Sequence, residues 1–443
     1  MTTQTVFRIV AGANSYDWGK IGGNSKAGQY ARADPEFKLQ ADKPYSELWM
    51  GTHPTLPSKL QSGEKLYDHL QAHPELLGDK VRKQYGGDLP FLFKVLAIEK
   101  ALSIQAHPNK KLAEELHKER PDVYKGMSNS DITHRIQLTS CSQMITTKYP
   151  EMAIAITPFS GFCNFRPLPE ISTFLSSVPE FASLIPPQAA SNLSSSPSDS
   201  KVALREVFGA LMSAPSDQIQ STLDQLIKRY ESGGATPVES DVADLAQTLA
   251  KQYPGDRTNR MRISLVISSS VWPLQASLTR ISQVLNHNLD WIRQRRPGRI
   301  DAQTKRCTDP RINVNLQLGP SRRPAHGAKA VQRWIKVRFA YIYAHAIVFT
   351  WFLSSDSDSY TTLYDPPIPE FSVLLTDVPA GKKASHRSLD GPSIFIVTSG
   401  SGSVSSQDIK SEGEVWFAGA GQSLEFTAGE QGLVLYRAFV EVA

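Results

Sequence analysis

The spacing of apolar residues changes twice along the chain, and these changes restrict the folds that it can adopt. Residues 1 to about 165 contain short apolar or alternating runs such as "LPFLFKVLAI", broken by Gly, Pro and Asn, as is typical of β-strands. From about Pro167 to Tyr253 the apolar residues recur at helical spacing, and after Ser359 strand-like runs separated by Gly and Ser return. The pattern therefore predicts a mainly β protein with a helical insertion.

Two helices of the insertion are defined by their apolar stripes. In "SKVALREVFGALM" the apolar side chains fall at i, i+3, i+4, i+7 and i+8, namely at Leu204, Val207, Phe208, Leu211 and Met212. The next helix is predicted to have Ser216 as its N-cap and to carry on one face Ile219, Leu223, Leu226, Ile227 and Tyr230. Stripes at this spacing are typical of a helical core rather than of a cofactor site.

The changes of pattern divide the chain into four parts. They are an N-terminal β domain (1–165), a helical insertion (166–256), a segment with little sustained periodicity (257–359) and a C-terminal β sandwich or barrel (360–443). At 443 residues the chain is long enough for several such units, each with its own core.

The basic character of the chain comes from one segment. Between Arg257 and Asp358 there are 17 Lys and Arg against 5 Asp and no Glu, a charge of +12, whereas the rest of the chain has 31 basic and 38 acidic residues, or −7. A nucleic-acid patch is one interpretation of "WIRQRRPGRI" in this segment. Because no helix-turn-helix, zinc-finger or aromatic RNA-binding signature accompanies it, we expect no nucleic-acid partner.

The sequence also indicates where the protein resides. It has no run of about 18 uncharged apolar residues, so we expect no membrane span. Its first residues lack the basic start and apolar stretch of a secretory signal. Cys141, Cys163 and Cys307 show no paired or metal-type spacing, which suits unpaired thiols in a reducing compartment. We therefore expect a cytoplasmic protein.

A polar strand face provides the first candidate for a functional site. In "KALSIQAHPNKK" the side chains of Ser103, Gln105 and His107 alternate with apolar ones, so on a strand they project to one side. An imidazole nitrogen and an amide oxygen are two potential metal ligands, and imidazole suits zinc. Glu151, just before the apolar run "MAIAI", offers a third. A solvated strand face and an ordinary strand-entry charge are the alternatives that this spacing leaves open.

Several longer motifs carry a resemblance to a known family. They are "YDWGK" (Tyr16–Lys20), "PYSELWMGTHP" (Pro44–Pro54), "LPFLFKVLAIEKALSIQAHPNK" (Leu89–Lys110), "PEMAIAITPFSGFCNFRPL" (Pro150–Leu168) and "YDPPIPEFSVL" (Tyr364–Leu374). In this order they resemble the type I mannose-6-phosphate isomerases. The resemblance implies cupin-like (jelly-roll) β-barrels in the N- and C-terminal parts, with an α-helical domain between them.

The same resemblance implies an activity. It is the zinc-dependent interconversion of mannose 6-phosphate and fructose 6-phosphate, an aldose–ketose isomerisation that supplies mannose for GDP-mannose and for glycosylation or cell-wall synthesis. We expect one Zn²⁺ per chain, a hexose 6-phosphate substrate, and a monomer that binds neither nucleic acid nor membrane. A non-catalytic cupin-like protein that binds a sugar or a metal is the alternative.

Residues are assigned to the site by their match to the family motifs. Gln105, His107 and Glu151 match three of the family's four zinc ligands. The candidates for the surrounding pocket are Lys100, Ser103, Glu47 and Trp18. The residue that moves the proton between C2 and C1 is not assigned.

The first departure from the family lies between Lys125 and Pro150. A segment absent from the family, "GMSNSDITHRIQLTSCSQMITTKY", stands here and puts Tyr149 where the family has lysine. Gly126-Met127-Ser128 can be encoded by GGT ATG TCN, which contains the intron donor sequence GTATGT. A retained intron and a genuine surface loop are the two hypotheses, and a transcript read across these codons distinguishes them.

The second departure is the segment from 257 to 358. The family's fourth zinc ligand, a histidine in a Pro-His-Ala-Tyr context, and its active-site arginine have no match there. Among His287, His326 and His345, none has the family's neighbours, and His345 in "YAHAI" has the most strand-like setting. We hypothesise that this segment derives from a mis-spliced or out-of-frame exon, and that isomerase activity is therefore severely reduced.

Overall fold

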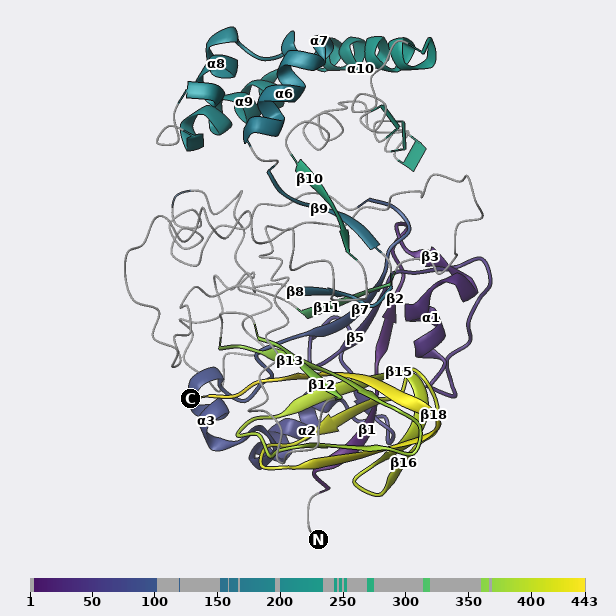
Figure 1. Cartoon of the computed structure of the whole chain (residues 1–443). Helices are drawn as coiled ribbons and strands as arrows, with labels where there is room; N and C mark the ends of the chain where they lie inside the picture. The colour runs from purple at the N-terminus through teal and green to yellow at the C-terminus, as the bar shows by residue number, and fades with distance from the viewer. Residues whose placement is uncertain are drawn as a thin grey trace.

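Two large β-sheets and a group of helices make up the protein (Figure 1). The computed structural model describes residues 4–101, 119, 152–157, 159–165, 168–195, 200–233, 243–244, 247–248, 251–252, 269–274, 314–318, 360–365 and 369–442. Its β-sheets and helical part confirm the prediction of a mainly β protein with a helical insertion. No helix within these ranges is long and apolar enough to cross a membrane.

The larger sheet contains the C-terminal strands and also the first strand of the chain. Its order is β12-β13-β18-β15-β17-β1-β6, with β14 paired to β18 and β16 to β15. The strands are β1 (Val6–Val10), β6 (Lys59–Leu60), β12 (Thr361–Tyr364), β13 (Ser372–Val378), β14 (Lys383–His386), β15 (Ser393–Val404), β16 (Gln407–Ile409), β17 (Val415–Ala418) and β18 (Leu424–Phe439). Ser405 and Ser406 have positive φ angles of 44° and 69°, as a tight two-residue hairpin between β15 and β16 requires.

The second sheet carries the sequence motifs of the N-terminal part. It has the order β2-β5-β7-β11-β8, formed by β2 (Gly12–Asn14), β5 (Glu47–Met50), β7 (Phe93–Ala97), β11 (Val314–Leu318) and β8 (Met152–Ala155). Strand β11 runs parallel to both β7 and β8. Separately, β10 (Ser269–Leu274) pairs with β9 (Phe159–Phe165). The segment 257–359 thus contributes β11 to the second sheet and β10 to the pair with β9. Its limits as a separate part of the chain stay a prediction.

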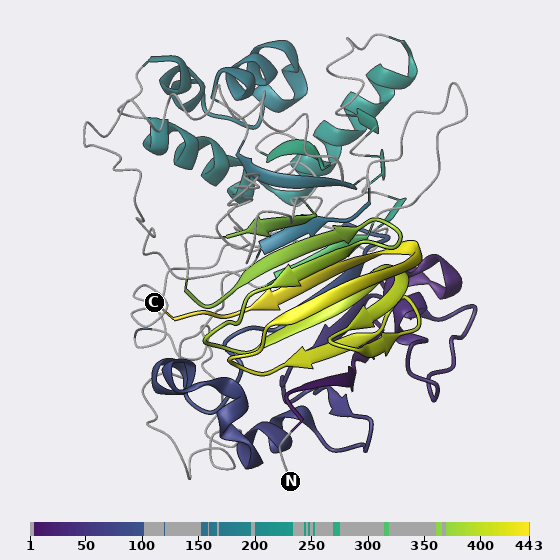
Figure 2. The same cartoon turned by 60° about the horizontal axis from the view of Figure 1, so that its bottom comes forward.

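The two large sheets pack against each other over one hydrophobic core (Figure 2). The N-terminal strand β1 is antiparallel to β17, and the rings of Phe7 and Phe417 stack with centroids 5.1 Å apart. Buried residues from both sheets form this core, among them Ile9, Leu48, Met50, Phe93, Val95, Val373, Ile394, Ile396 and Val415. Because a sheet must bury its apolar face against another element, the N- and C-terminal strands depend on each other for stability.

Short elements connect and cover these sheets. They are β3 (Lys20–Ile21), β4 (Pro44–Tyr45), α1 (Lys26–Ala31), α2 (Leu66–Ala72), α3 (Asp79–Tyr85) and the 3₁₀ turns η1 (Gly22–Asn24) and η2 (Pro74–Leu77). The side chain of Ser25 accepts a hydrogen bond from the Gly28 N–H and so caps α1.

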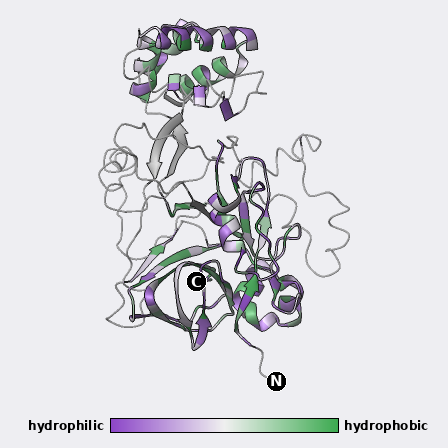
Figure 3. Cartoon of the chain, turned by 90° about the vertical axis from the view of Figure 1, so that its right-hand side faces the viewer, coloured by the Kyte–Doolittle hydropathy of each residue, from purple (hydrophilic) through white to green (hydrophobic). Residues whose placement is uncertain are grey.

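The helical insertion contains α6 (Leu168–Ser177), α7 (Pro179–Ala182), α8 (Pro187–Ser195), α9 (Ser200–Ser213) and α10 (Ser216–Glu231). Hydrophobic and hydrophilic residues occur side by side along these helices (Figure 3). On α10 the predicted residues Ile219, Leu223 and Leu226 are buried. The predicted N-cap is wrong, because the helix already includes Ser216 and its cap residue is Pro215, which makes no side-chain hydrogen bond.

A polar layer crosses the interior of the C-terminal strands. Thr376 on β13 and Arg437 on β18 are fully buried. On each strand, the apolar residue two positions before this polar residue and the one two positions after it belong to different hydrophobic clusters. His386 joins them, with Nε2 2.9 Å from Thr376 Oγ1 and Nδ1 3.1 Å from Arg437 Nη1. Arg437 Nε also donates to Ser393 Oγ at 2.9 Å. The layer therefore ties four strands together by hydrogen bonds.

Candidate active site

The two faces of the second sheet differ in character. Leu48 and Met50 on β5 face the shared core, so Glu47 and Trp49 must project from the opposite face. The antiparallel register places Trp49 opposite Lys94 of β7. A carboxylate, an indole and an ammonium group therefore gather on one face of adjacent strands.

Direct contacts hold these three side chains together. Trp49 Nε1 donates a hydrogen bond of 2.6 Å to Glu47 Oε2. Lys94 Nζ lies 3.9 Å from Glu47 Oε1 and 4.2 Å from the centre of the Trp49 ring. The side chains of Lys94 and Glu47 are 15% and 12% exposed, so this ion pair and the cation–π contact are shielded from most of the solvent.

His53 lies next to this cluster. Its ring meets the Trp49 ring edge-on, with centroids 4.9 Å apart, and the residue is exposed. It belongs to the motif "GTHP" directly after β5. The polar face thus includes an accessible imidazole.

The motif "YDWGK" forms a turn near the end of β7. The Gly19 N–H donates to the Tyr16 carbonyl at 2.9 Å, and the Tyr16 N–H donates to Ser46 Oγ at 2.9 Å. The Trp18 carbonyl accepts hydrogen bonds from the backbone N–H groups of Glu99 at 2.9 Å and Lys100 at 3.2 Å. The rings of Tyr16 and Trp18 stack with centroids 5.7 Å apart. The turn is thereby fixed both to the residue before Glu47 and to the segment that follows β7.

The structure separates the two lysines of this region. Lys100, chosen from the sequence as a pocket residue, has Nζ 3.4 Å from Asp17 Oδ2, and the Asp17 side chain is 82% exposed. Lys94 was not chosen, yet it contacts Glu47 and Trp49 directly. The signal that could have identified it is a lysine inside the apolar strand "FKVLA", because a charged residue in a half-buried strand needs partners.

The predicted metal ligands lie outside the described residues. This holds for Gln105, His107 and Glu151, and also for Ser103 and His345. Met152, which follows Glu151, begins β8, and Val314 of β11 pairs with both Met152 and Phe93. Within the described ranges no three or more His, Cys, Asp or Glu side chains form a metal-binding group. The zinc ligand set therefore stays a prediction.

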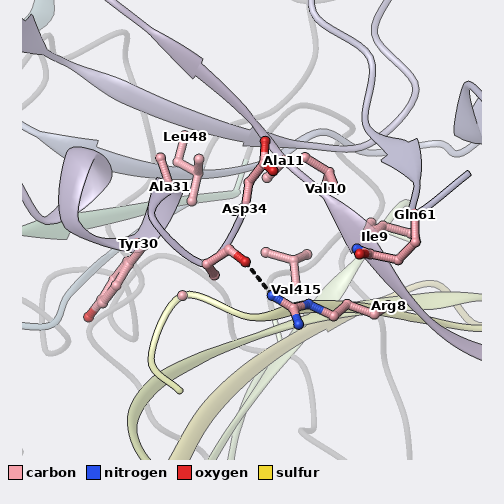
Figure 4. Close-up of a pocket in the computed structure, with 12 residues that line it drawn as sticks. Arg8, Ile9, Val10, Ala11, Tyr30, Ala31, Asp34, Leu48, Gln61 and Val415 are labelled. Atoms are coloured by element: carbon pink, nitrogen blue, oxygen red, sulfur yellow. Dashed lines mark hydrogen bonds between the residues drawn. The ribbon is translucent and has the colours of Figure 1, made fainter. Parts of the chain in front are cut away.

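A small pocket lies on the other side of β5 (Figure 4). It is lined by residues of β1, α1 and β17, and by Leu48, whose side chain faces away from Glu47. Arg8 donates a hydrogen bond to the Ala33 carbonyl here and lies 3.5 Å from Glu414 Oε1. Burial raises the pKa of Tyr30 at the same pocket above its usual value of 10.0. This pocket belongs to the junction of the two sheets rather than to the polar face.

Comparison with known families matches the chain in three pieces. Residues 6–168 match the catalytic domain of type I phosphomannose isomerase, residues 178–258 match its helical insertion domain, and residues 362–408 match its C-terminal part. The resemblance carried by the sequence motifs is thereby confirmed.

Similar proteins come from fungi and bacteria. The mannose-6-phosphate isomerase of Cryptococcus neoformans var. neoformans serotype D is 37% identical over 469 aligned positions, covering 99% of both chains. That of Saccharomyces cerevisiae is 32% identical, covering 98% of this chain and 99% of the relative. The Salmonella typhimurium mannose 6-phosphate isomerase, solved with substrate (f6p) and zinc, has a TM-score of 0.59 at 18% identity, covering 99% of this chain and 100% of that one. The last comparison shows that the fold is shared, and together these matches show that the chain belongs to the type I phosphomannose isomerase family.

Proposed function

We propose that the chain is a zinc-dependent isomerase that interconverts mannose 6-phosphate and fructose 6-phosphate. The observation that carries this proposal is the Glu47–Trp49–Lys94 cluster, which lies on the sheet face opposite the core. Strand β7, which contributes Lys94, leads directly towards the segment with the predicted metal ligands. Fungal relatives bearing this activity in their names match over nearly the whole chain, which supports the same conclusion.

The predicted donors suit zinc by their chemistry. His107 offers an imidazole nitrogen, Glu151 a carboxylate and Gln105 an amide oxygen, of which the first two are common zinc ligands. A bound zinc ion would polarise the carbonyl and hydroxyl oxygens of the sugar while the proton moves between C2 and C1. We propose one ion per chain.

Lys94 is the residue of the described cluster best suited to hold an anionic group of the substrate. Its ammonium is a compact charge with three donors. Glu47 and the Trp49 ring fix its position before any ligand arrives, which lowers the ordering cost on binding. Glu47 itself is fixed through Oε2 by Trp49. The cluster therefore presents a preorganised charge on the sheet face.

The wider role follows from this activity. We propose that the protein works in the cytoplasm as a monomer and supplies mannose phosphate for GDP-mannose, and hence for glycosylation or cell-wall synthesis. The alternative is a non-catalytic cupin-like protein that binds a sugar or metal. The unmatched fourth ligand and arginine in the segment 257–358 are what favour that alternative.

Proton exchange distinguishes these two functions. We would incubate the zinc-loaded protein with fructose 6-phosphate in D₂O and follow both sugars by NMR. An isomerase forms mannose 6-phosphate and exposes the migrating proton to exchange, so deuterium should appear at C1 or C2. Binding of the sugar with neither mannose 6-phosphate nor deuterium uptake would favour the non-catalytic alternative.

A further inference from the structure

Two histidines lie one helical turn apart at the end of α2. His69 is in the last turn of the helix, and His73 is its C-cap residue. The His73 N–H donates to the His69 carbonyl at 2.9 Å, which closes this turn. Side chains four positions apart on a helix are neighbours, and here the two imidazole rings have centroids 4.7 Å apart with a tilt of 48°. The rings therefore lie next to each other on one side of the helix.

Each imidazole has a carboxylate at its Nδ1 atom. His69 Nδ1 lies 3.2 Å from Glu64 Oε2, and His73 Nδ1 lies 3.4 Å from Glu75 Oε1. An ionised carboxylate only accepts hydrogen bonds, so Nδ1 of each neutral ring carries the proton and Nε2 keeps the lone pair. Histidines that bind metal ions almost always donate their other ring N–H to such an acceptor. Two carboxylate–histidine pairs thus stand side by side.

The spacing of the two rings suits a shared metal ion. An ion about 2.0–2.1 Å from one nitrogen of each ring lies roughly 3.2 Å from both ring centres, which places these centres about 4.5–5.2 Å apart at N–metal–N angles of about 90–110°. The observed separation of 4.7 Å falls within this range. The side chains of His69 and His73 are 15% and 37% exposed, so an ion can reach them from the solvent.

The histidine pair lies where the N-terminal and C-terminal parts of the chain meet. Helix α2 is next to β1 (Figure 1), and the His69 ring meets the Phe7 ring edge-on with centroids 5.3 Å apart. Phe7 in turn stacks on Phe417 of β17. Just beyond α2, the Leu76 carbonyl in η2 accepts the Ala420 N–H at 2.9 Å. An ion held by the two rings would therefore brace the turn that contacts the C-terminal strands.

We propose that His69 and His73 form a binding site for a late first-row divalent metal ion, separate from the predicted zinc site of the isomerase. Imidazole nitrogen suits Ni²⁺, Cu²⁺ and Zn²⁺. Both rings bind through Nε2, with Glu64 and Glu75 as positioning residues. Water completes the coordination, because the described ranges contain no group of three or more His, Cys, Asp or Glu side chains that could hold a metal. The bound ion stabilises the folded chain, because the unfolded chain does not hold the two rings together.

The test uses the whole chain with Ni²⁺ as the probe. The variants are His69→Gln, His73→Gln, the double variant of both, and Glu64→Gln, which removes a carboxylate that contacts only the ring Nδ1. The matched control is Asp68→Asn, because Asp68 is an acidic residue of the same helix that belongs to neither carboxylate–histidine pair. We would titrate each protein with Ni²⁺ by calorimetry and measure its urea midpoint with and without the ion.

The double variant should bind one Ni²⁺ fewer than the wild type, and each single histidine variant should bind this ion at least about tenfold more weakly. Glu64→Gln should weaken it about tenfold, near the lower limit for residues that orient metal ligands, and Asp68→Asn should leave it unchanged. Ni²⁺ should raise the urea midpoint of the wild type more than that of the double variant.

The inference is overturned if the double variant binds as many Ni²⁺ ions as the wild type with equal affinity. It is also overturned if Asp68→Asn weakens binding as much as Glu64→Gln does, since the effect would then be one of general charge. Isomerase activity is not the readout, so a failure of the proposed function leaves this result unaffected.

Discussion

The Nζ atom of Lys94 lies 4.2 Å from the centre of the Trp49 ring. The same ring donates its indole N–H to Glu47, whose other carboxylate oxygen is 3.9 Å from Nζ. Each of the three side chains therefore restrains the other two. Such mutual restraint places the charges on the sheet face in a fixed geometry, which is the requirement for electrostatic catalysis.

Replacing Lys94 by Met should lower kcat/KM by at least about 100-fold, because it removes a fixed charge from the proposed site. Lys383→Met is the matched control, since Lys383 on β14 pairs with the largely exposed Glu425 and such pairs contribute little. A coupled isomerase assay on both variants, with melting curves to confirm folding, measures the difference. Equal losses for the two variants would show that Lys94 has no special part in the site.

The Trp49–Glu47 hydrogen bond can be tested through protein stability. Trp49→Phe removes a donor to a buried carboxylate, whereas Trp416→Phe removes an indole N–H that is buried without a partner among the described residues. Trp49→Phe should therefore lower the free energy of unfolding by about 1.5–3 kcal/mol more than Trp416→Phe. Urea unfolding of both variants gives the comparison. A larger loss for Trp416→Phe would contradict the assigned hydrogen bond.

The shared core predicts that the N- and C-terminal strands unfold together. Phe417 is fully buried and stacks on Phe7 of the N-terminal strand, so Phe417→Ala should cost about 3–5 kcal/mol. We would follow denaturation by near-UV circular dichroism and by isomerase activity. The two transitions should shift together in the variant. Activity that survived after the spectroscopic transition would show that the N-terminal sheet is stable alone.

His386 should make the protein less stable in acid. Arginine only donates hydrogen bonds, so His386 Nδ1 must accept from Arg437, and the imidazole is neutral. Burial, reinforced by the charge of Arg437, lowers the pKa of His386 well below its usual value of 6.5. The unfolded chain takes up a proton below pH 6.5 that the folded chain does not. The stability contributed by this site is therefore complete above pH 6.5 and is lost as the pH falls towards the folded-state pKa.

The contribution of His386 can be measured from how steeply the free energy of unfolding changes with pH. Between pH 6.5 and the pKa of the folded state, it should reduce the free energy of unfolding by about 1.4 kcal/mol per pH unit. His386→Gln has no titrating ring, so its stability should fall less steeply with acid by that amount. Urea unfolding at pH 7, 6 and 5 measures both slopes. Identical slopes would mean that folding does not lower the pKa of His386.

The sequence predicted those features that depend on local periodicity. The helical stripe of α10 and the β runs on either side of the insertion were visible because burial on one face repeats at a fixed interval. Strand alternation also identifies the polar face of a strand, but not its neighbour in the sheet. For this reason the pairing of β1 with β17, more than 400 residues apart in sequence, was not predicted.

The site was only partly predictable for the same physical reason. Family motifs predicted Glu47 and Trp18 as pocket candidates, whereas a lysine within an apolar strand marks Lys94 only as a residue that needs partners; its partners Glu47 and Trp49 become known from the register. The hydrogen bond from the Ala101 N–H to Gln252 Oε1 has no local pattern at all. At the start of α10, Ser216 is a residue type that commonly caps helices, but the N-cap of the helix is the preceding residue, Pro215. Partners distant in sequence are set by tertiary packing, which periodicity does not encode.

The proposed activity is tested most directly by a coupled isomerase assay on the 443-residue chain, with zinc content measured on the same sample. We expect turnover of mannose 6-phosphate that a chelator abolishes and added zinc restores. Because the fourth ligand and the arginine have no match, the rate should lie well below that of the Saccharomyces cerevisiae relative. A chain that binds zinc and sugar phosphate but shows no turnover would contradict the proposed activity.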